Sequence, residues 1–225
     1  MKFRAIIFDF NGLIVDDEHI HCECFQKVLA EEEITLTEKD YWDIYLGFDD
    51  KGLIEAIFER NGKKPTPKKL KDLIRKKADL YLPILEKKLK FFPGVLDFIQ
   101  KTRGKCLLAV VSGALRSEID FALKKAEIAD AFATIVSAEE TKHGKPDPQG
   151  YLLALARLKQ KNAEIRPENC LALEDSRAGI EAAHRARMKC AGLTHSYPRE
   201  KLKEADWVVE SFDELSQIIL KGEFP

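Results

Sequence analysis

The sequence lacks any uninterrupted apolar stretch approaching the roughly 18 residues that a membrane-spanning helix needs, so we expect no membrane contact. Cysteine is scarce, with five residues that lie mostly within apolar runs. This usage is typical of buried small side chains in a reducing compartment. One residue separates Cys22 from Cys24 and no second pair follows, which argues against a zinc site. The chain shows no signal peptide and enters a strand directly, so we expect a cytoplasmic protein.

A dominant charge of one sign is also missing, because 37 Lys and Arg nearly balance 38 Asp and Glu. Residues 63–90 are an exception, with eleven basic against three acidic side chains. We interpret this stretch as the solvated face of a helix pair, the alternative being an anion-attracting rim above an active site. Aromatic residues do not alternate with these lysines and no nucleic-acid-binding motif accompanies them, so we expect no nucleic-acid partner.

Short apolar runs alternate with helical patterns through most of the chain. The runs, each typical of a buried strand, span residues 4–10, 106–111, 134–136, 170–173 and 189–193. Helical periodicity is found at residues 115–126, 149–158 and 177–186. This alternation predicts an α/β fold, a doubly wound, Rossmann-like parallel sheet with helices on both faces. Ligands of such sheets bind at the carboxyl ends of the strands.

One interval interrupts the alternation. Between residues 17 and 92 there is no good strand, and several amphipathic helices are separated by glycine and proline positions such as Gly47 and Gly62. The alternation resumes after a turn signal at Pro93 and Gly94. We therefore predict a small α-helical domain, residues 17–92, inserted into an α/β core of residues 1–16 and 93–225. A chain of 225 residues is long enough to hold both.

The first predicted strand leads into Asp9, with Asn11 two positions further on. Because side chains alternate along a strand, Asp9 and Asn11 are expected to point to the same side. A carboxylate at the carboxyl end of a strand, exposed in the crevice, can act as a nucleophile or as a metal ligand. Gly12 allows the chain to turn sharply at this point.

Polar groups also follow three further predicted strands. Ser112 and Gly113 precede a helix, where a hydroxyl group and backbone amides can bind an anion. Lys145 can hold an anionic phosphoryl group against a nucleophile. Glu174 and Asp175 end an apolar run, and adjacent acids there are costly unless they are paired or bound to a metal such as Mg²⁺. Each feature alone is more often a turn or a helix cap, but the four in this order favour an active site.

These four segments resemble the signature motifs of the haloacid dehalogenase superfamily, and within it the β-phosphoglucomutase-like branch of phosphatases and mutases. The first motif of that branch reads Asp-x-Asp-Gly-x-x-x-Asp-(Ser/Thr)-Glu and is followed shortly by a His. In those places this chain carries Asp9, Gly12, Asp16, Glu18 and His21. Residues 144–148 together with Tyr151, and residues 174–176, also resemble the branch, and the helical insertion resembles its cap domain in position and size.

The resemblance implies a Mg²⁺-dependent phosphatase in which Asp9 attacks phosphorus and forms an aspartyl-phosphate that water then hydrolyses. The metal ligands that it implies are Asp9, the backbone carbonyl of Asn11, Glu174 and Asp175. The phosphoryl group would be held by Ser112, Gly113 and Lys145. We expect the partner to be a small phosphorylated metabolite, such as a sugar phosphate, and the protein to be a monomer or a weak dimer.

Asn11 is a departure from the family pattern, which has a second Asp there that protonates the leaving oxygen and then activates water. A carboxamide can do neither near neutral pH. Three explanations stay open. Asn11 is an introduced substitution, or it is natural and turnover is weak or supported by Asp17 or His21, or the chain only binds a phosphorylated ligand. Losing a positioned general acid/base typically costs about 10²–10⁴ in rate.

The predicted insertion bears on the substrate. Mutases of this branch tend to carry an Arg shortly after the position of Gly47, where this chain reads Phe-Asp-Asp at residues 48–50. These acids would repel a second phosphate, which favours a phosphatase over a phosphosugar mutase. Lys51 and Lys77 can add positive charge, but we interpret both as solvated helix residues. His21 is expected either near the substrate at the hinge of the insertion or on a solvent-facing helix.

Overall fold

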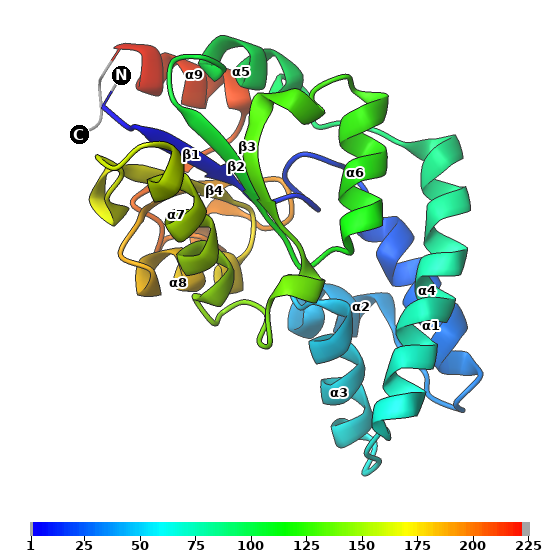
Figure 1. Cartoon of the computed structure of the whole chain (residues 1–225). Coiled ribbons are helices and arrows are strands. Elements are labelled where there is room, and N and C mark those ends of the chain that lie inside the picture. Colours follow the sequence, from blue (N-terminus) through cyan, green and yellow to red (C-terminus); the bar gives the residue numbers. More distant parts are fainter. Residues whose placement is uncertain (1, 222–225) are drawn as a thin grey trace.

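A computed structural model describes residues 2–221, which form a parallel sheet in the order β3-β2-β1-β4-β5-β6 (Figure 1). The strands are β1 (Ala5–Phe8), β2 (Leu107–Val111), β3 (Phe132–Val136), β4 (Cys170–Glu174), β5 (Lys189–Leu193) and β6 (Trp207–Val209). The predicted doubly wound sheet is confirmed. Strand β6 was not predicted and extends the sheet beyond β5. Within the described part of the chain, no helix has both the length and the apolarity to cross a membrane.

Alternating side chains of β1 divide the core into two layers. Ile6 and Phe8 belong to a cluster shared with helices on one face of the sheet, whereas Ala5 and Ile7 belong to a cluster on the other. The first face carries α5 (Val95–Thr102), α6 (Arg116–Lys125) and α9 (Phe212–Lys221), and the second carries α7 (Gln149–Lys161) and α8 (Arg177–Arg185). Short 3₁₀ helices connect these elements at Ala129–Ala131, Ala138–Glu140, Pro167–Asn169 and Arg199–Lys201.

The segment between β1 and α5 is helical and lies to one side of the sheet (Figure 1). It comprises α1 (Glu18–Ala30), α2 (Glu38–Asp40), a π-helical turn (Tyr41–Tyr45), α3 (Asp50–Arg60) and α4 (Pro67–Lys88). Its apolar side chains form a cluster of their own that includes Phe25, Leu53 and Leu73. The second half of α4 instead joins the main core through Tyr81 and Leu85. The exact division at residues 16/17 and 92/93 stays a prediction.

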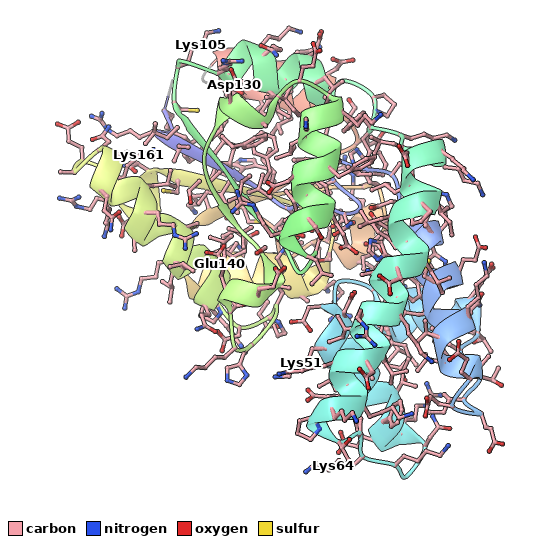
Figure 2. The ribbon with its side chains drawn as sticks, turned by 45° about the vertical axis from the view of Figure 1, so that its right-hand side comes forward. Lys51, Lys64, Lys105, Asp130, Glu140 and Lys161 are labelled. Atoms are coloured by element: carbon pink, nitrogen blue, oxygen red, sulfur yellow. The ribbon has the colours of Figure 1, made fainter. Side chains whose placement is uncertain are left out.

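The lysine-rich stretch is solvated as predicted, with one exception. Lys51 and Lys64 project outward from the inserted helices (Figure 2), and the other lysines of residues 63–90 are exposed apart from Lys77. The interpretation of Lys77 as a solvated residue is wrong, because its side chain is fully buried. Its Nζ lies 3.1 Å from Asp50 Oδ1 and 3.3 Å from Glu118 Oε1. Lys77 therefore joins α3 and α4 of the insertion to α6 of the core.

Replacing Lys77 with Met removes the cation from between two buried carboxylates, and we expect the free energy of unfolding to fall by about 3–5 kcal/mol. Burial raises the pKa of Glu118, so part of this loss should disappear as the pH falls and that carboxylate takes up a proton. Urea denaturation at several pH values measures both effects.

The matched control is Lys76→Met. Lys76 is the residue before Lys77, and its exposed side chain is paired with Glu31. We expect it to cost less than about 1 kcal/mol. Equal losses for the two variants would contradict a stabilising role for the buried ion pairs of Lys77.

Candidate active site

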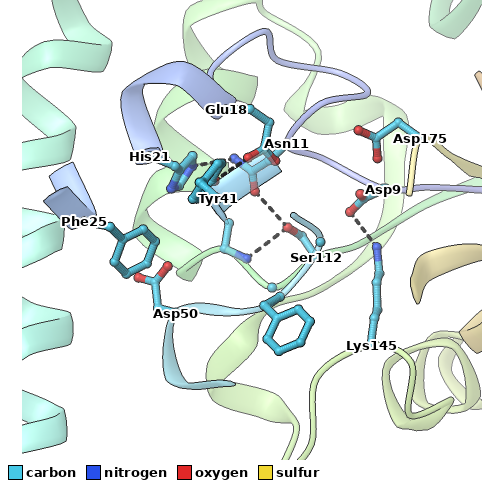
Figure 3. Close-up of a pocket in the computed structure, with 14 residues that line it drawn as sticks. Asp9, Asn11, Glu18, His21, Phe25, Tyr41, Asp50, Ser112, Lys145 and Asp175 are labelled. Atoms are coloured by element: carbon cyan, nitrogen blue, oxygen red, sulfur yellow. Dashed lines mark hydrogen bonds and ion pairs between the residues drawn. The ribbon is translucent and has the colours of Figure 1, made fainter. Parts of the chain in front are cut away.

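The polar residues that were predicted at strand ends converge at the carboxyl edge of the sheet (Figure 3). Asp9 follows β1 directly, Ser112 follows β2, and Glu174 is the last residue of β4. Strand β1 lies between β2 and β4, so these side chains are neighbours. Asp175 follows Glu174, and Lys145 reaches the same place from the loop that precedes α7.

Lys145 joins the first and last of these segments. Its Nζ lies 2.7 Å from Asp9 Oδ1 and 2.6 Å from Glu174 Oε1. Burial opposes the charged form of Lys145, but the carboxylates of Asp9 and Glu174 outweigh it and raise its pKa above the ordinary value. Lys145 therefore carries a positive charge at neutral pH directly beside Asp9, where it can attract a phosphoryl group.

Three carboxylates form the acidic part of the site. Oxygens of Asp9, Glu174 and Asp175 all lie within 4.8 Å of one another, and all three residues are buried. Burial, followed by the charge of Asp9, raises the pKa of Glu174 to about 7 and that of Asp175 well above its ordinary value. A close set of hard oxygen donors with a single adjacent lysine fits a divalent cation such as Mg²⁺, which would relieve their mutual repulsion.

Two glycines allow this close packing. Gly12 has a φ of 70°, and a Cβ atom there would collide with the carboxylate of Asp175. At Gly113, which lines the pocket as expected, a Cβ would lie 3.0 Å from the Cβ of Asp49 in the insertion. The first glycine lets the loop after Asp9 pass against Asp175, and the second lets the insertion rest on the core.

The side chain of Asn11 is held at both ends. Its Nδ2 donates to Asp17 Oδ2 at 2.8 Å and lies 2.9 Å from His21 Nε2. The Ser112 hydroxyl lies 3.4 Å from Asn11 Oδ1, which it can reach as a donor (Figure 3). A carboxylate in place of this amide would bring an oxygen against the oxygen of Asp17. The surroundings of residue 11 are therefore suited to an amide.

Of the two residues proposed to support turnover, His21 lines the pocket and Asp17 does not. Asp17 is fully buried and accepts a hydrogen bond from the Tyr81 hydroxyl, while its Oδ1 has no hydrogen-bond partner among the described residues. His21 lines the pocket, with its ring 4.3 Å from that of Tyr81. Burial and Lys77 disfavour the protonated ring, but Asp17 outweighs them and the pKa of His21 is raised.

The pocket lies between the core and the insertion. The core side is formed by the residues described above, and the insertion contributes Glu18, His21, Phe25, Tyr41, Phe48 and Asp50. Of the possible substrate-contacting residues, Gly47 and His21 line the pocket, whereas Lys77 is not among the lining residues. The space open to water inside this pocket is about 40 Å³, which holds a few water molecules.

Several groups of the site were not recognised from the sequence. The Tyr41 hydroxyl donates to Glu18 Oε2 at 2.5 Å, and burial raises the pKa of Glu18 to about 7. The Ser196 hydroxyl donates to Asp175, and the Tyr151 hydroxyl donates to Glu174. Glu18 and Tyr151 belong to the segments that resemble the family motifs, which is a signal that could have marked them. Nothing local in the sequence distinguishes Tyr41 or Ser196.

Comparisons with known proteins found chains of similar sequence and a structure of similar fold. Protein CbbY from Rhodobacter capsulatus is 29% identical over 216 residues, which cover 92% of each chain. A phosphorylated carbohydrates phosphatase from Thermotoga maritima is 29% identical over 197 residues, which cover 86% of each chain. A crystal structure of β-phosphoglucomutase from Clostridium difficile shares the fold, with a TM-score of 0.86 at 24% identity over 99% of this chain and 97% of that one.

Comparison of the chain with models of protein families identifies the same family as the motifs. Residues 6–193, most of the chain, match the family described as haloacid dehalogenase-like hydrolase. This match includes all four segments that converge at the sheet edge, and the fold of the β-phosphoglucomutase structure agrees with it. The predicted resemblance is confirmed, and the chain belongs to the haloacid dehalogenase-like hydrolase family.

Proposed function

We propose that the chain is a Mg²⁺-dependent phosphatase that hydrolyses a small phosphorylated metabolite, with Asp9 as the nucleophile. The observation that carries the proposal is the contact between Lys145 and Asp9, because Asp9 also belongs to the acidic cluster with Glu174 and Asp175. When bound, Mg²⁺ would neutralise negative charge on the transferring phosphoryl group. Asp9, Glu174, Asp175 and the backbone carbonyl of Asn11 would hold it. The name of the Thermotoga maritima relative supports a phosphorylated carbohydrate as the substrate.

The chain's own residues divide the reaction into two transfers. A carboxylate oxygen of Asp9 attacks phosphorus, the bond from phosphorus to the ester oxygen breaks, and an aspartyl-phosphate forms while the alcohol leaves. Water then attacks the same phosphorus and releases phosphate, which regenerates Asp9. Lys145 and the Ser112 hydroxyl hold the phosphoryl oxygens during both steps. The leaving oxygen must gain one proton, and the attacking water must lose one.

The amide of Asn11 can neither donate a proton to the leaving oxygen nor accept one from the attacking water, so another group must do so. The hydrogen bond from Asn11 to Asp17 favours a natural Asn11 over an introduced one, since an Asp there would bring a half-buried carboxylate against the buried carboxylate of Asp17. His21 lines the pocket and is the better placed of the two supporting residues, whereas Asp17 lies behind Asn11. A protein that only binds a phosphorylated ligand is the alternative.

The first test is hydrolysis of an aryl phosphate. We expect activity that is lost with EDTA and restored by Mg²⁺, and that Asp9→Asn abolishes. Lys145→Met should lower kcat by about 10²–10³, because the transferring group loses its adjacent positive charge. Lys142→Met is the matched control on the exposed part of the same loop and should leave kcat unchanged. Metal-independent turnover, or equal activity of the two lysine variants, would contradict the proposed mechanism.

The second test exchanges the amide and the carboxylate of residues 11 and 17. Asn11→Asp supplies the missing proton carrier but places a half-buried carboxylate against the buried Asp17, so we expect faster turnover and a loss of about 1–3 kcal/mol in stability. This loss should grow as the pH rises above about 4, where carboxylates ionise. Adding Asp17→Asn restores one amide-to-carboxylate hydrogen bond. The double variant should recover the stability and turn over about 10²–10⁴ faster than the natural sequence.

The same variants distinguish catalysis from binding alone. Steady-state kinetics with Mg²⁺ and urea denaturation are measured for both single variants and for the double variant. If every variant is folded yet none hydrolyses any ester of a broad phosphate panel, the phosphatase proposal is wrong. Calorimetry that then shows binding of sugar phosphates would identify a phospho-ligand-binding protein.

A further inference from the structure

The insertion contributes to the pocket a carboxylate of which only one oxygen has a polar partner. Asp50, the first residue of α3, lines the pocket and is 8% exposed. Its Oδ1 lies 3.1 Å from Lys77 Nζ, but its Oδ2 is buried and has no hydrogen-bond partner among the residues described. Such an oxygen is unfavourable unless a donor reaches it. In Figure 3 Asp50 lies on the opposite side of the view from Asp9 and Lys145.

Among the described residues around Asp50, no lysine or arginine is free to bind a second phosphate, and His21 on the same side of the pocket already contacts Asn11 and Asp17. Lys77 is fully buried, and its ammonium group is already shared between Asp50 and Glu118. The insertion adds another carboxyl group, Glu18, to the same side of the pocket. Among the described lining residues the single lysine is Lys145, and both Asp9 and Glu174 contact it. A second phosphate on the substrate would therefore meet carboxylates on this side of the pocket.

We propose that Asp50 selects the alcohol part of the substrate, a step that rests on the proposed phosphatase function. The substrate is a phosphate monoester whose alcohol carries a hydroxyl or ammonium group that donates a hydrogen bond to Asp50. Esters with a second phosphate are rejected, because their negative charge would be desolvated against Asp50 and Glu18.

Residues that line the pocket can contact each part of such a substrate. The phosphoryl group lies at Asp9 and Lys145, and the carbon skeleton extends past the aromatic rings of Phe25 and Phe48, which also line the pocket. The far end of the substrate then meets Asp50. Because Lys77 balances part of its charge, Asp50 can accept from a neutral hydroxyl as well as from an ammonium group. A site built to accept a hydrogen bond discriminates strongly against an analogue that lacks the donor.

The test uses linear alkyl phosphates that differ only at the far end of the chain. Four sets are compared, with methyl, hydroxyl, ammonium or a second phosphate at that end, each with three to six carbons so that the distance to Asp50 is sampled. We expect kcat/KM with Mg²⁺ to be about tenfold or more higher for the best hydroxyl or ammonium ester than for the methyl ester of the same length. The bisphosphates should be the poorest substrates.

Two variants of Asp50 and one control assign the preference to this residue. Asp50→Asn should reduce the preference for ammonium over methyl by about tenfold, and Asp50→Ala should also remove the preference for hydroxyl. Both should improve the bisphosphates relative to the methyl esters. Glu118→Gln removes the other carboxylate that contacts Lys77, and Glu118 is not among the pocket-lining residues. The substrate preferences of this variant should therefore stay unchanged. Ratios of kcat/KM within one sample do not depend on how much of the variant is folded.

The outcomes separate the two proposals. If no ester is hydrolysed by the natural chain or by the variants of residues 11 and 17, the phosphatase function itself has failed. If the esters are hydrolysed but the methyl esters or bisphosphates are equal to or better than the donor-bearing esters, the proposed role of Asp50 is wrong. Equal changes of preference in Asp50→Asn and Glu118→Gln would also overturn it, because the effect would then come from the surrounding charge and not from contact with Asp50.

Discussion

The crowding of three buried carboxylates at the end of the central strand is the constraint on which the rest of the site depends. Asp9, Glu174 and Asp175 repel one another, and among the described residues Lys145 is the cation that directly contacts two of them. The hydroxyl of Tyr151 and other donors reduce the cost without cancelling the charge. An arrangement of this kind favours a divalent cation together with an anionic ligand. The parallel sheet makes it possible, because β1 and β4 are neighbours and end at the same edge.

A second charged network lies behind the first and reaches into the insertion. Asn11 connects the pocket to Asp17 and His21, and Lys77 connects the insertion to α6. The two networks differ in what they can do. The first can bind a metal and a phosphoryl group, whereas the second holds Asn11 and the helices of the insertion in place. Asp50 belongs to this second network and also lines the pocket, so one of the groups that hold the insertion against the core faces the pocket as well.

Much of the fold, and the convergence of the polar strand-end residues at one edge of the sheet, could be predicted from the sequence, because each depends on local pattern. Continuous apolar runs mark β1 to β5, and the polar residues that follow them must meet at one edge of a parallel sheet. Strand β6 was missed because three residues carry little signal. Lys77 was misinterpreted because it resembles the exposed lysines around it, and its burial depends on Asp50 and Glu118, which are distant in sequence. The contact of Ser196 with Asp175 is likewise a product of tertiary structure alone.

A nucleophilic Asp9 must form a covalent bond to phosphorus during turnover, and acid quenching followed by mass spectrometry can detect that bond. The chain with Asn11 is mixed with Mg²⁺ and an aryl phosphate, whose leaving group needs little proton transfer. The reaction is stopped within the first turnovers, and the chain is digested and its phosphorylated peptide is mapped. We expect a hydroxylamine-sensitive phosphoryl group on the peptide that contains Asp9, absent from Asp9→Asn, and more abundant with Asn11 than with Asp at that position because hydrolysis of the intermediate is slowed. Turnover without any phosphoryl group on Asp9, or with the group on another residue, would contradict the account.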